Sequence, residues 1–96
     1  MDLSKIKGFD WDEGNRFKNK VKHNVFQREA EEIFTNVPLI ISPDVKHSRN
    51  EMRYYALGKS NNNRLIFIAF TFRKSKIRVI SARDQSRKER RIYEKT

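Results

Sequence analysis

The sequence contains no cysteine, only three glycines and two prolines, and no long hydrophobic run. The absence of cysteine excludes a disulfide scaffold and a thiolate metal site, and it is compatible with a cytoplasmic protein. The longest apolar run, at 65–70, is far too short to cross a bilayer, and no signal peptide is expected before it. With so few glycines there is also no glycine-rich loop of the kind that cradles phosphates.

Positive charge is abundant and unevenly distributed. The 96 residues have a formal net charge of +10. Residues 1–45 hold seven Lys or Arg and eight Asp or Glu, a net of −1, whereas residues 46–96 hold fifteen and four, a net of +11. This asymmetry is typical of nucleic-acid binding, although an anionic membrane or an acidic protein partner gives the same signal. The length predicts a single domain, 1–96.

The first third of the chain is predicted to form a helical hairpin. Asp12 suits the N-cap of a first helix, whose apolar stripe contains Phe17 and Val21. Asn24 can adopt the left-handed conformation that ends many helices. A second helix is expected over 27–35, because its apolar residues recur at helical spacing.

The remainder is predicted to be a small sheet. A short strand is expected at 8–11, and the longer ones are separated by turn signals such as Ser60-Asn61-Asn62-Asn63. Connections this short favour an antiparallel meander, with the helices covering one face, so the fold class is α+β. The four later strands are expected at 39–41, 52–57, 64–72 and 76–82.

The C-terminal segment is predicted to be a short basic helix. Ser86 and Glu89 fit the capping box, in which each side chain bonds to the backbone of the other. Four cations on this helix and one on the last strand are candidate RNA contacts: Arg87, Lys88, Arg90, Arg91 and Arg78.

The side chains present can support metal-free RNA cleavage, which needs a base near the ribose 2′-hydroxyl, cations on the phosphate, and an acid for the leaving oxygen. His23 and His47 lack metal-ligand spacing, so no metal and no cofactor are expected. The bland alternatives are a helix C-terminal residue for His23 and a solvated loop residue for His47. Trp11, Tyr54 and Tyr55 could stack on bases, but core packing is favoured.

Strand alternation assigns faces to the arginines. Arg73 shares a face with Thr71, Ala69 and Phe67. Arg83 is expected on the face of Ser81, Val79 and Ile77, and Arg78 on the opposite one. An arginine that continues an apolar face could form a site, or it could pair with a carboxylate such as Glu51.

Several stretches, in order and at conserved spacing, resemble the BrnT-type toxins. The similarity covers roughly residues 8 to 95. Two positions depart from the family pattern: Asn24 stands where glycine is usual, and Asn15 where lysine is frequent. The matching residues are Phe9-Asp10-Trp11-Asp12, Asn19, Lys22-His23, Val25, Glu29-Ala30, Ile33-Phe34, His47-Ser48, Glu51, Arg53, Leu57-Gly58, Phe70-Thr71, Arg73, the run 77–83, the run 87–91 and Tyr93-Glu94.

The resemblance implies a RelE-like fold and a ribonuclease toxin of a type II toxin–antitoxin pair, which inhibits translation and arrests growth. It also implies a hetero-oligomer with an antitoxin of the ribbon-helix-helix type that binds operator DNA. Six candidate catalytic residues follow from it: Lys22, His23, Glu51, Arg53, Arg73 and Arg83.

Two other functions are compatible with the sequence. One is a non-catalytic nucleic-acid-binding module whose terminal helix lies on phosphates. The other is an inactive toxin homologue that acts within an antitoxin complex, for which the departures at Asn15 and Asn24 leave room.

Overall fold

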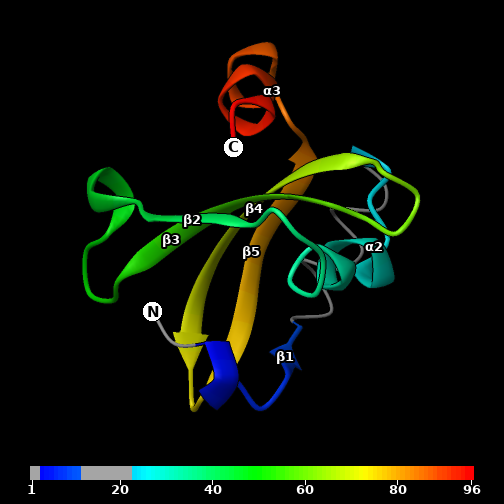
Figure 1. Ribbon diagram of the computed structural model, residues 1–96. Helices are drawn as coiled ribbons and strands as arrows, with labels where there is room; N and C mark the ends of the chain where they lie inside the picture. The colour runs from blue at the N-terminus through cyan, green and yellow to red at the C-terminus, as the bar shows by residue number, and fades with distance from the viewer. Residues whose placement is uncertain (1–2, 12–22) are drawn as a thin grey trace.

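A five-stranded sheet forms the centre of the protein (Figure 1), and its strand order is β1-β5-β4-β3-β2. The computed structural model describes residues 3–11 and 23–96. The elements are η1 (Leu3–Lys5), β1 (Phe9–Asp10), α2 (Gln27–Glu32), β2 (Ile40–Pro43), η2 (Val45–His47), β3 (Arg53–Lys59), β4 (Leu65–Arg73), β5 (Lys76–Asp84) and α3 (Arg87–Glu94).

The predicted antiparallel meander is confirmed for β2 to β5. The turn between β4 and β5 consists of Lys74 and Ser75, with φ of 54° and 65°. Two consecutive positive φ values are typical of the two-residue turn whose twist matches that of the flanking strands. Asn63, with φ of 64°, serves the loop between β3 and β4. These two tight turns fix the register of the three longest strands.

The sheet is mixed, which the sequence did not predict. β1 pairs with β5 in parallel, with Phe9 opposite Ile77 and Asp10 opposite Arg78. The amide of Ile77 donates to the carbonyl of Gly8 at 3.0 Å. β1 is separated from β5 by more than sixty residues, so it is free to join the outer edge of β5 in either direction.

α2 covers one face of the sheet. The buried side chains of Ala30 and Ile33 belong to the same core cluster as Ile66, Ile68 and Phe70 of β4. Each isoleucine or phenylalanine side chain of this cluster contributes roughly 1.5–3 kcal/mol when fully buried. Contact with Ile33 explains why β3 has a glycine at position 58, because a Cβ there would lie only 2.9 Å from the Cβ of Ile33. The close approach of α2 to β3 therefore requires glycine.

The predicted helical hairpin is confirmed only in its second half. The first helix was predicted over 12–24, and residues 12–22 of it lie outside the described residues. Asn24 does adopt the left-handed conformation, with φ of 54°. α2 ends at Glu32, three residues before the predicted end, and the chain continues as tight turns in which Phe34 and Thr35 bond back to carbonyls three residues earlier.

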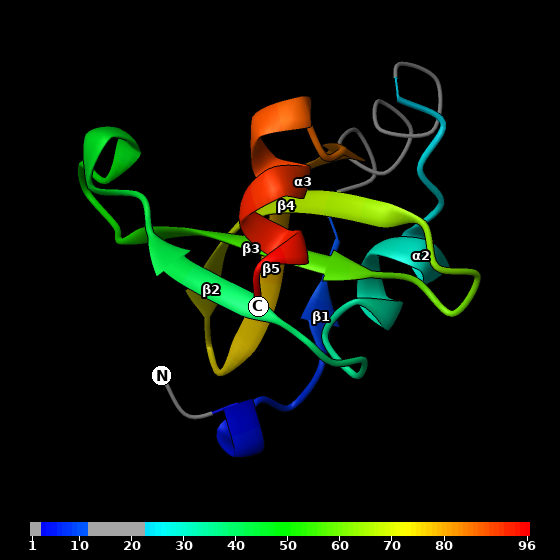
Figure 2. The ribbon, with the colours of Figure 1, turned by 45° about the horizontal axis from the view of Figure 1, so that its top comes forward.

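The predicted terminal helix and its capping box are both confirmed. The amide of Glu89 donates to Ser86 Oγ at 3.2 Å, and the amide of Ser86 donates to Glu89 Oε1 at 2.7 Å. Tyr93 anchors the helix, because its ring is buried and its hydroxyl donates to the carbonyl of Pro38 at 2.7 Å. Figure 2 shows α3 crossing in front of the sheet. Within the described part of the chain, no helix has the length and apolar character needed to span a membrane.

Candidate functional site: a cationic pocket beside β3

A small hydrogen-bonded loop precedes β3 and forms one side of a hollow that is lined by charged side chains. Asp44 begins the loop, and its carbonyl accepts from the amide of His47 and from Ser48 Oγ, the latter at 2.8 Å. Ser48 Oγ in turn accepts from the amide of Arg53 at 2.9 Å, while the amide of Asp44 donates to the carbonyl of Arg53 at 2.7 Å. The loop is therefore fixed to the first residue of β3.

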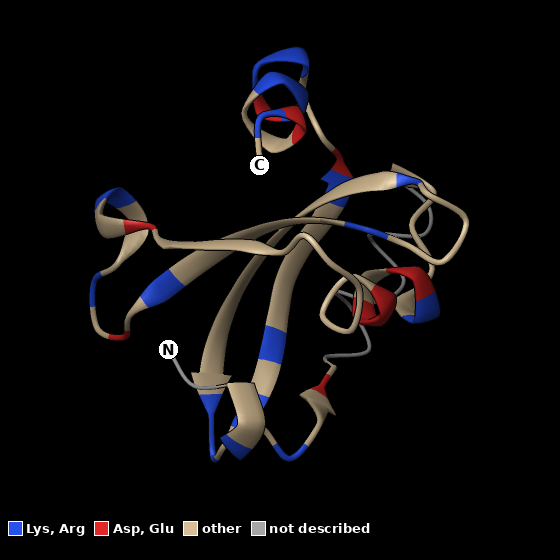
Figure 3. Ribbon diagram, viewed as in Figure 1, with Lys and Arg blue, Asp and Glu red and all other residues tan. Residues whose placement is uncertain are grey.

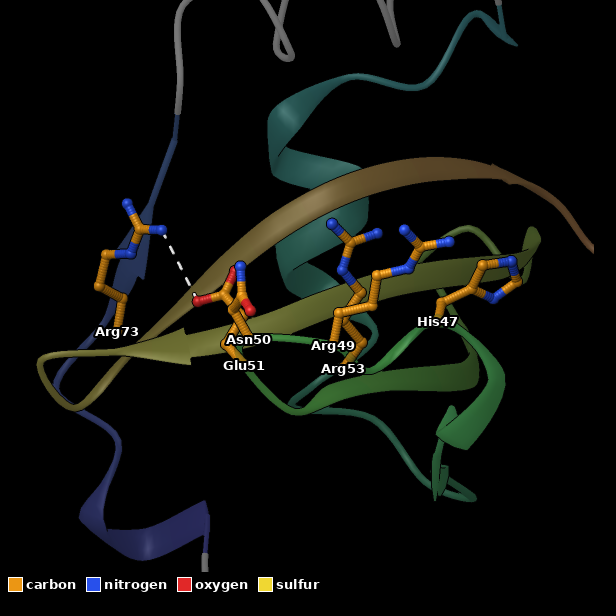
Figure 4. Close-up of a pocket in the computed structure, with 6 residues that line it drawn as sticks. All are labelled: His47, Arg49, Asn50, Glu51, Arg53 and Arg73. Carbon is orange, nitrogen blue, oxygen red and sulfur yellow. Dashed lines mark ion pairs between the residues drawn. The ribbon is translucent and has the colours of Figure 1, made fainter.

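The hollow between this loop and the end of β4 has a volume of about 630 Å³ and is called the cationic pocket below (Figure 4). Among its described lining residues there are three arginines and one carboxylate. Figure 4 shows His47 at one end and Arg73 at the other, with the remaining side chains between them. Its lining residues are His47, Arg49, Asn50, Glu51, Arg53 and Arg73.

The cations of the pocket are weakly paired. Arg73 approaches Glu51 at 3.7 Å, and the two side chains are 47% and 42% exposed. An exposed ion pair at this distance contributes at most about 1 kcal/mol. Neither Arg49 nor Arg53 has a side-chain hydrogen bond or ion pair to any residue in the described ranges 3–11 and 23–96. Several guanidinium groups are thus available to an anion, and Arg can hold two phosphate oxygens at once.

Three of the six residues predicted to be catalytic meet here: Glu51, Arg53 and Arg73. The predicted face of Arg73 agrees with the structure, since Ile68, Phe70 and Phe72 of β4 face the core cluster and the residues between them lie on the other face. The possibility that an arginine of the sheet pairs with Glu51 is realised by Arg73.

Arg83 lies at the opposite end of the β4–β5 hairpin, where it pairs with Phe67, whereas Arg73 pairs with Lys76 beside the turn. Its two terminal nitrogens donate to the two carboxylate oxygens of Glu89 at 2.8 and 3.0 Å. Its guanidinium also lies 4.0 Å from the centre of the Phe67 ring. This bidentate, stacked arrangement holds the start of α3 against β5.

The predicted faces of β5 are wrong in one respect. Arg78 was expected to face away from Arg83, but both lie on the sheet face that is opposite the main core. The reason is a β-bulge: Ala69 pairs with Ser81 and Phe70 pairs with Val79, so Ile80 is an extra residue that shifts the alternation. Val79 and Ile77 are consequently buried in the core cluster. Arg78 forms an ion pair with Asp10 of β1 at 3.2 Å.

His23 is not among the residues that line the cationic pocket. Lys22 lies outside the described residues, and the backbone carbonyl of His23 accepts from Arg64 Nη2 at 3.2 Å. Arg64 also donates to the carbonyl of Asn24 at 2.8 Å and forms ion pairs with Glu29 at 3.1 Å and Asp84 at 2.7 Å. Arg64 therefore connects the segment before α2 to the last residue of β5.

The ion pairs at the α3 end of the sheet shift the pKa values of three groups. The hydrogen bond to Asp84 raises the pKa of Arg64, and the same bond lowers the pKa of Asp84. Burial raises the pKa of the Glu89 carboxyl, but the hydrogen bonds from Arg83 and from the Ser86 amide outweigh burial, so this pKa lies below its ordinary value. Both carboxylates stay ionised near neutral pH and hold their arginines in place.

The basic residues of α3 are exposed, and Figure 3 shows their positions along the helix in blue. Between them and the cationic pocket lies a face of the sheet whose side chains are only partly covered, including Tyr55, Ala69 and Ser81. The exposed cations are the four predicted RNA contacts of the helix: Arg87, Lys88, Arg90 and Arg91.

The three aromatic residues considered for base stacking separate into two groups. Trp11 donates from Nε1 to Glu31 at 2.8 Å and packs on the core, as Tyr54 does. Tyr55 lies on the opposite face and stacks on Phe67 with ring centres 6.0 Å apart. Core packing is thus confirmed for Trp11 and Tyr54.

Sequence reasoning missed three pocket residues: His47, Arg49 and Asn50. A solvated loop residue was the favoured interpretation of His47, and its side chain is indeed 61% exposed; the contact with Asp44 was not predicted. The signal that could have identified it is the spacing Asp-x-x-His-Ser, because a turn of this length brings the carboxylate of Asp44 onto the imidazole, at 2.7 Å. Among the described residues, no group of three or more His, Cys, Asp or Glu has metal-binding geometry.

Arginines, a carboxylate and an imidazole in one hollow are side chains of the types that bind phosphate groups and transfer protons. Comparison with known proteins gives the family. Residues 11–89 match the model of a family described as the ribonuclease toxin, BrnT, of type II toxin–antitoxin systems. The chain belongs to this BrnT family of ribonuclease toxins, and an antitoxin partner is implied for it.

A solved structure agrees. The 1.1 Å crystal structure of the Brucella abortus ribonuclease toxin, BrnT, superposes with a TM-score of 0.62 at 25% sequence identity. The match covers 83% of this chain and 97% of the Brucella chain. No curated protein sequence matches. The structure therefore has the α+β fold of a BrnT toxin, with a five-stranded sheet and two helices in the described residues.

Proposed function

We propose that the protein is an endoribonuclease toxin that cleaves RNA without a metal ion at the cationic pocket. Glu51, Arg53 and Arg73 form its reacting centre, with Arg53 and Arg73 on the scissile phosphate. The single observation that supports this placement most strongly is the guanidinium of Arg53, which has no side-chain partner among the described residues although it lines a pocket with two more arginines. An unpaired cation of this kind stabilises the negative charge that develops on phosphoryl oxygens in the transition state.

The remaining candidates take supporting places in this proposal. Arg83 contacts the RNA backbone next to α3 while it stays bound to Glu89. His23 lies at the same end as Arg83, because Arg64 joins the His23 carbonyl to Asp84, and Lys22 stays a catalytic candidate outside the described residues. The exposed cations of α3 and Arg78 hold phosphates outside the reacting centre. The RNA would thus run along the sheet face from α3 to the cationic pocket.

The cellular role follows from the family. Cleavage of RNA in the cytoplasm inhibits translation and arrests growth, and a cognate antitoxin neutralises the toxin in a hetero-oligomer. We propose that this antitoxin is of the ribbon-helix-helix type and binds operator DNA. We also propose that the fold is RelE-like, with a first helix over 12–24 that completes the hairpin with α2.

The direct test is cleavage of a defined RNA by the purified protein in excess chelator. The expected products carry a 2′,3′-cyclic phosphate and a 5′-hydroxyl, because the base acts on the ribose 2′-hydroxyl. A 2′-deoxy substitution at the cleaved position should block the reaction. RNA that stays intact at high protein concentration would contradict the proposal.

A non-catalytic binding role has one observation in its favour, which is that four cations of α3 are exposed and free of the sheet. If these side chains bind phosphates alone, the affinity for RNA should fall steeply as salt rises, and it should lose about one unit of log–log slope per cation removed. Steep salt dependence without cleavage in chelator would support the binding module over the enzyme.

A further inference from the structure

The loop before β3 places an imidazole and a carboxylate in contact at the edge of the cationic pocket. His47 Nδ1 lies 2.7 Å from Asp44 Oδ2. The side chain of Asp44 is 24% exposed and that of His47 is 61% exposed. The carboxylate is thus largely covered while the imidazole reaches solvent and lines the pocket.

This contact fixes the roles of the two ring nitrogens. A carboxylate accepts a hydrogen bond, so Nδ1 must carry the proton that it donates to Asp44. In the neutral ring the lone pair is then on Nε2, at the opposite side of the imidazole from Asp44. An imidazole with its second nitrogen bound to a carboxylate is a well-oriented proton acceptor.

The backbone of the loop holds this pair rigidly. Asp44 bonds through its amide to the carbonyl of Arg53, and through its carbonyl to Ser48 Oγ and the amide of His47. Ser48 Oγ accepts from the amide of Arg53. His47 and Arg53 are therefore positioned by the same hydrogen-bond network, so an imidazole and an unpaired guanidinium line one cavity.

We propose that His47 is the general base of RNA cleavage and that Asp44 is its positioning residue. This inference rests on the proposed function of the cationic pocket and assigns the general base, which the six candidates at 22, 23, 51, 53, 73 and 83 left open. The bound substrate is a ribose 2′-hydroxyl next to a phosphodiester.

The reaction balances without a co-reactant. Nε2 takes the proton of the 2′-hydroxyl, and the 2′-oxygen forms a bond to phosphorus. The bond from phosphorus to the 5′-oxygen of the next nucleotide breaks, and that oxygen takes a proton from water. The imidazolium then returns its proton to the solvent, leaving a 2′,3′-cyclic phosphate and a 5′-hydroxyl. Arg53 and Arg73 stabilise the charge on the phosphoryl oxygens.

The pH dependence should identify this role, since histidine is the side chain that changes charge near neutral pH. The rate of the wild-type protein should rise with pH to a plateau as Nε2 loses its proton. Arginines remain charged throughout this range, and carboxylates are already ionised. The charged groups around His47 are Asp44 and Lys46 on its own turn, Arg49 and Glu51 in the next loop, Arg53 on β3 and Arg73 on β4.

The experiment compares His47→Gln and Asp44→Asn with Val45→Ala, a control in the same turn whose side chain is 75% exposed and outside the pocket. Single-turnover cleavage of a short RNA is measured in chelator across pH, and the affinity for a non-cleavable 2′-deoxy analogue is measured in parallel. His47→Gln should cleave about 100-fold more slowly, the factor typical of a lost general base, with unchanged affinity. Asp44→Asn should lose less, and Val45→Ala should match the wild type.

Two further readouts separate a chemical role from a structural one. His47→Gln should lack the rise of the rate with pH, and added imidazole should restore part of the activity of His47→Gly. A His47→Gln protein that cleaves at the wild-type rate with the wild-type pH profile overturns the inference, as does a slower variant that keeps that profile. If the wild type itself leaves RNA intact, the proposed function fails instead, so the two failures are distinguishable.

Discussion

The arginines at the two ends of the sheet differ in how closely they are paired with carboxylates. At the end near α3, Arg64 and Arg83 each contact a carboxylate at 2.7–2.8 Å, and Arg83 adds a second oxygen of Glu89 and the ring of Phe67. In the cationic pocket, Arg73 only approaches Glu51 at 3.7 Å, and Arg53 has no side-chain partner among the described residues.

This difference has a physical meaning. A guanidinium that is already held by carboxylates stabilises the fold, and a phosphate must compete with those carboxylates for it. A guanidinium without a partner contributes little to folding and is available for a bound anion. The arginines of the far end should therefore respond to mutation through stability, and those of the pocket through activity.

The largest effect is expected for Arg53→Ala. Cleavage of RNA in chelator should fall about 100-fold or more, which is typical for the loss of one group that stabilises transition-state charge. The melting temperature should stay near that of the wild type, because the guanidinium stabilises no described carboxylate. Arg28→Ala is the matched control, since this side chain is 82% exposed on α2 and carries the same charge. An Arg53→Ala protein that cleaves like Arg28→Ala would remove Arg53 from the site.

Arg64→Ala should destabilise the fold at the end of the sheet near α3. It leaves Glu29, Asp84 and the carbonyls of His23 and Asn24 without their donor. The expected loss is about 2 kcal/mol of unfolding free energy, which corresponds to a decrease of about 10 °C in melting temperature. Denaturant unfolding of Arg64→Ala, Asp84→Asn and the double variant measures the coupling. Additive losses would show that Arg64 and Asp84 do not stabilise each other.

Acid should weaken the α3 end selectively. The pKa of Glu89 is lowered in the folded protein, so its carboxylate stabilises the fold above its ordinary value of 4.5, and this stabilisation is lost as the pH falls through the lowered pKa. The stability difference between the wild type and Glu89→Gln should therefore be larger at neutral pH than well below pH 4.5. Thermal melts of both proteins across this range measure it, and a difference that does not change with pH would contradict the role of the charge.

The smallest effect is expected for Ser86→Ala, which removes one half of the capping box. The cost should be about 1 kcal/mol, or roughly 4–8 °C in melting temperature for a domain of this size. Cleavage well below the melting temperature should not change, because Ser86 belongs to the scaffold. A loss of cleavage without a loss of stability would instead place the start of α3 in the reacting centre.

Local patterns predicted most of the described fold. The strands β2 to β5 and α3 follow from short-range signals, namely apolar runs, turn residues and the pair Ser86 and Glu89. The parallel pairing of β1 depends on contacts more than sixty residues apart and has no local signature. The bulge at Ile80 likewise has no local signature in the sequence. It places Arg78 on the same face as Arg83, whereas opposite faces were predicted.

The candidate site was predictable in its residue types but not in its grouping. Glu51, Arg53 and Arg73 were identified and do meet, whereas Arg83 was placed with them by resemblance although it lies at the other end of β5. His47 was expected to be a solvated loop histidine, which agrees with its exposure, but its place in the pocket was not predicted. Only the fold shows that Asp44 holds it beside Arg53.

The comparison of the two ends is tested most directly by measuring cleavage of one RNA in excess chelator by Arg53→Ala and Arg83→Ala, with a thermal melt of each protein. We expect Arg53→Ala to be nearly inactive with an unchanged melting temperature. Arg83→Ala should keep more of the activity and melt at a lower temperature, because α3 loses its link from Glu89 to β5. The opposite ranking, with Arg53→Ala active and Arg83→Ala folded but inactive, would contradict the account and move the reacting centre to α3.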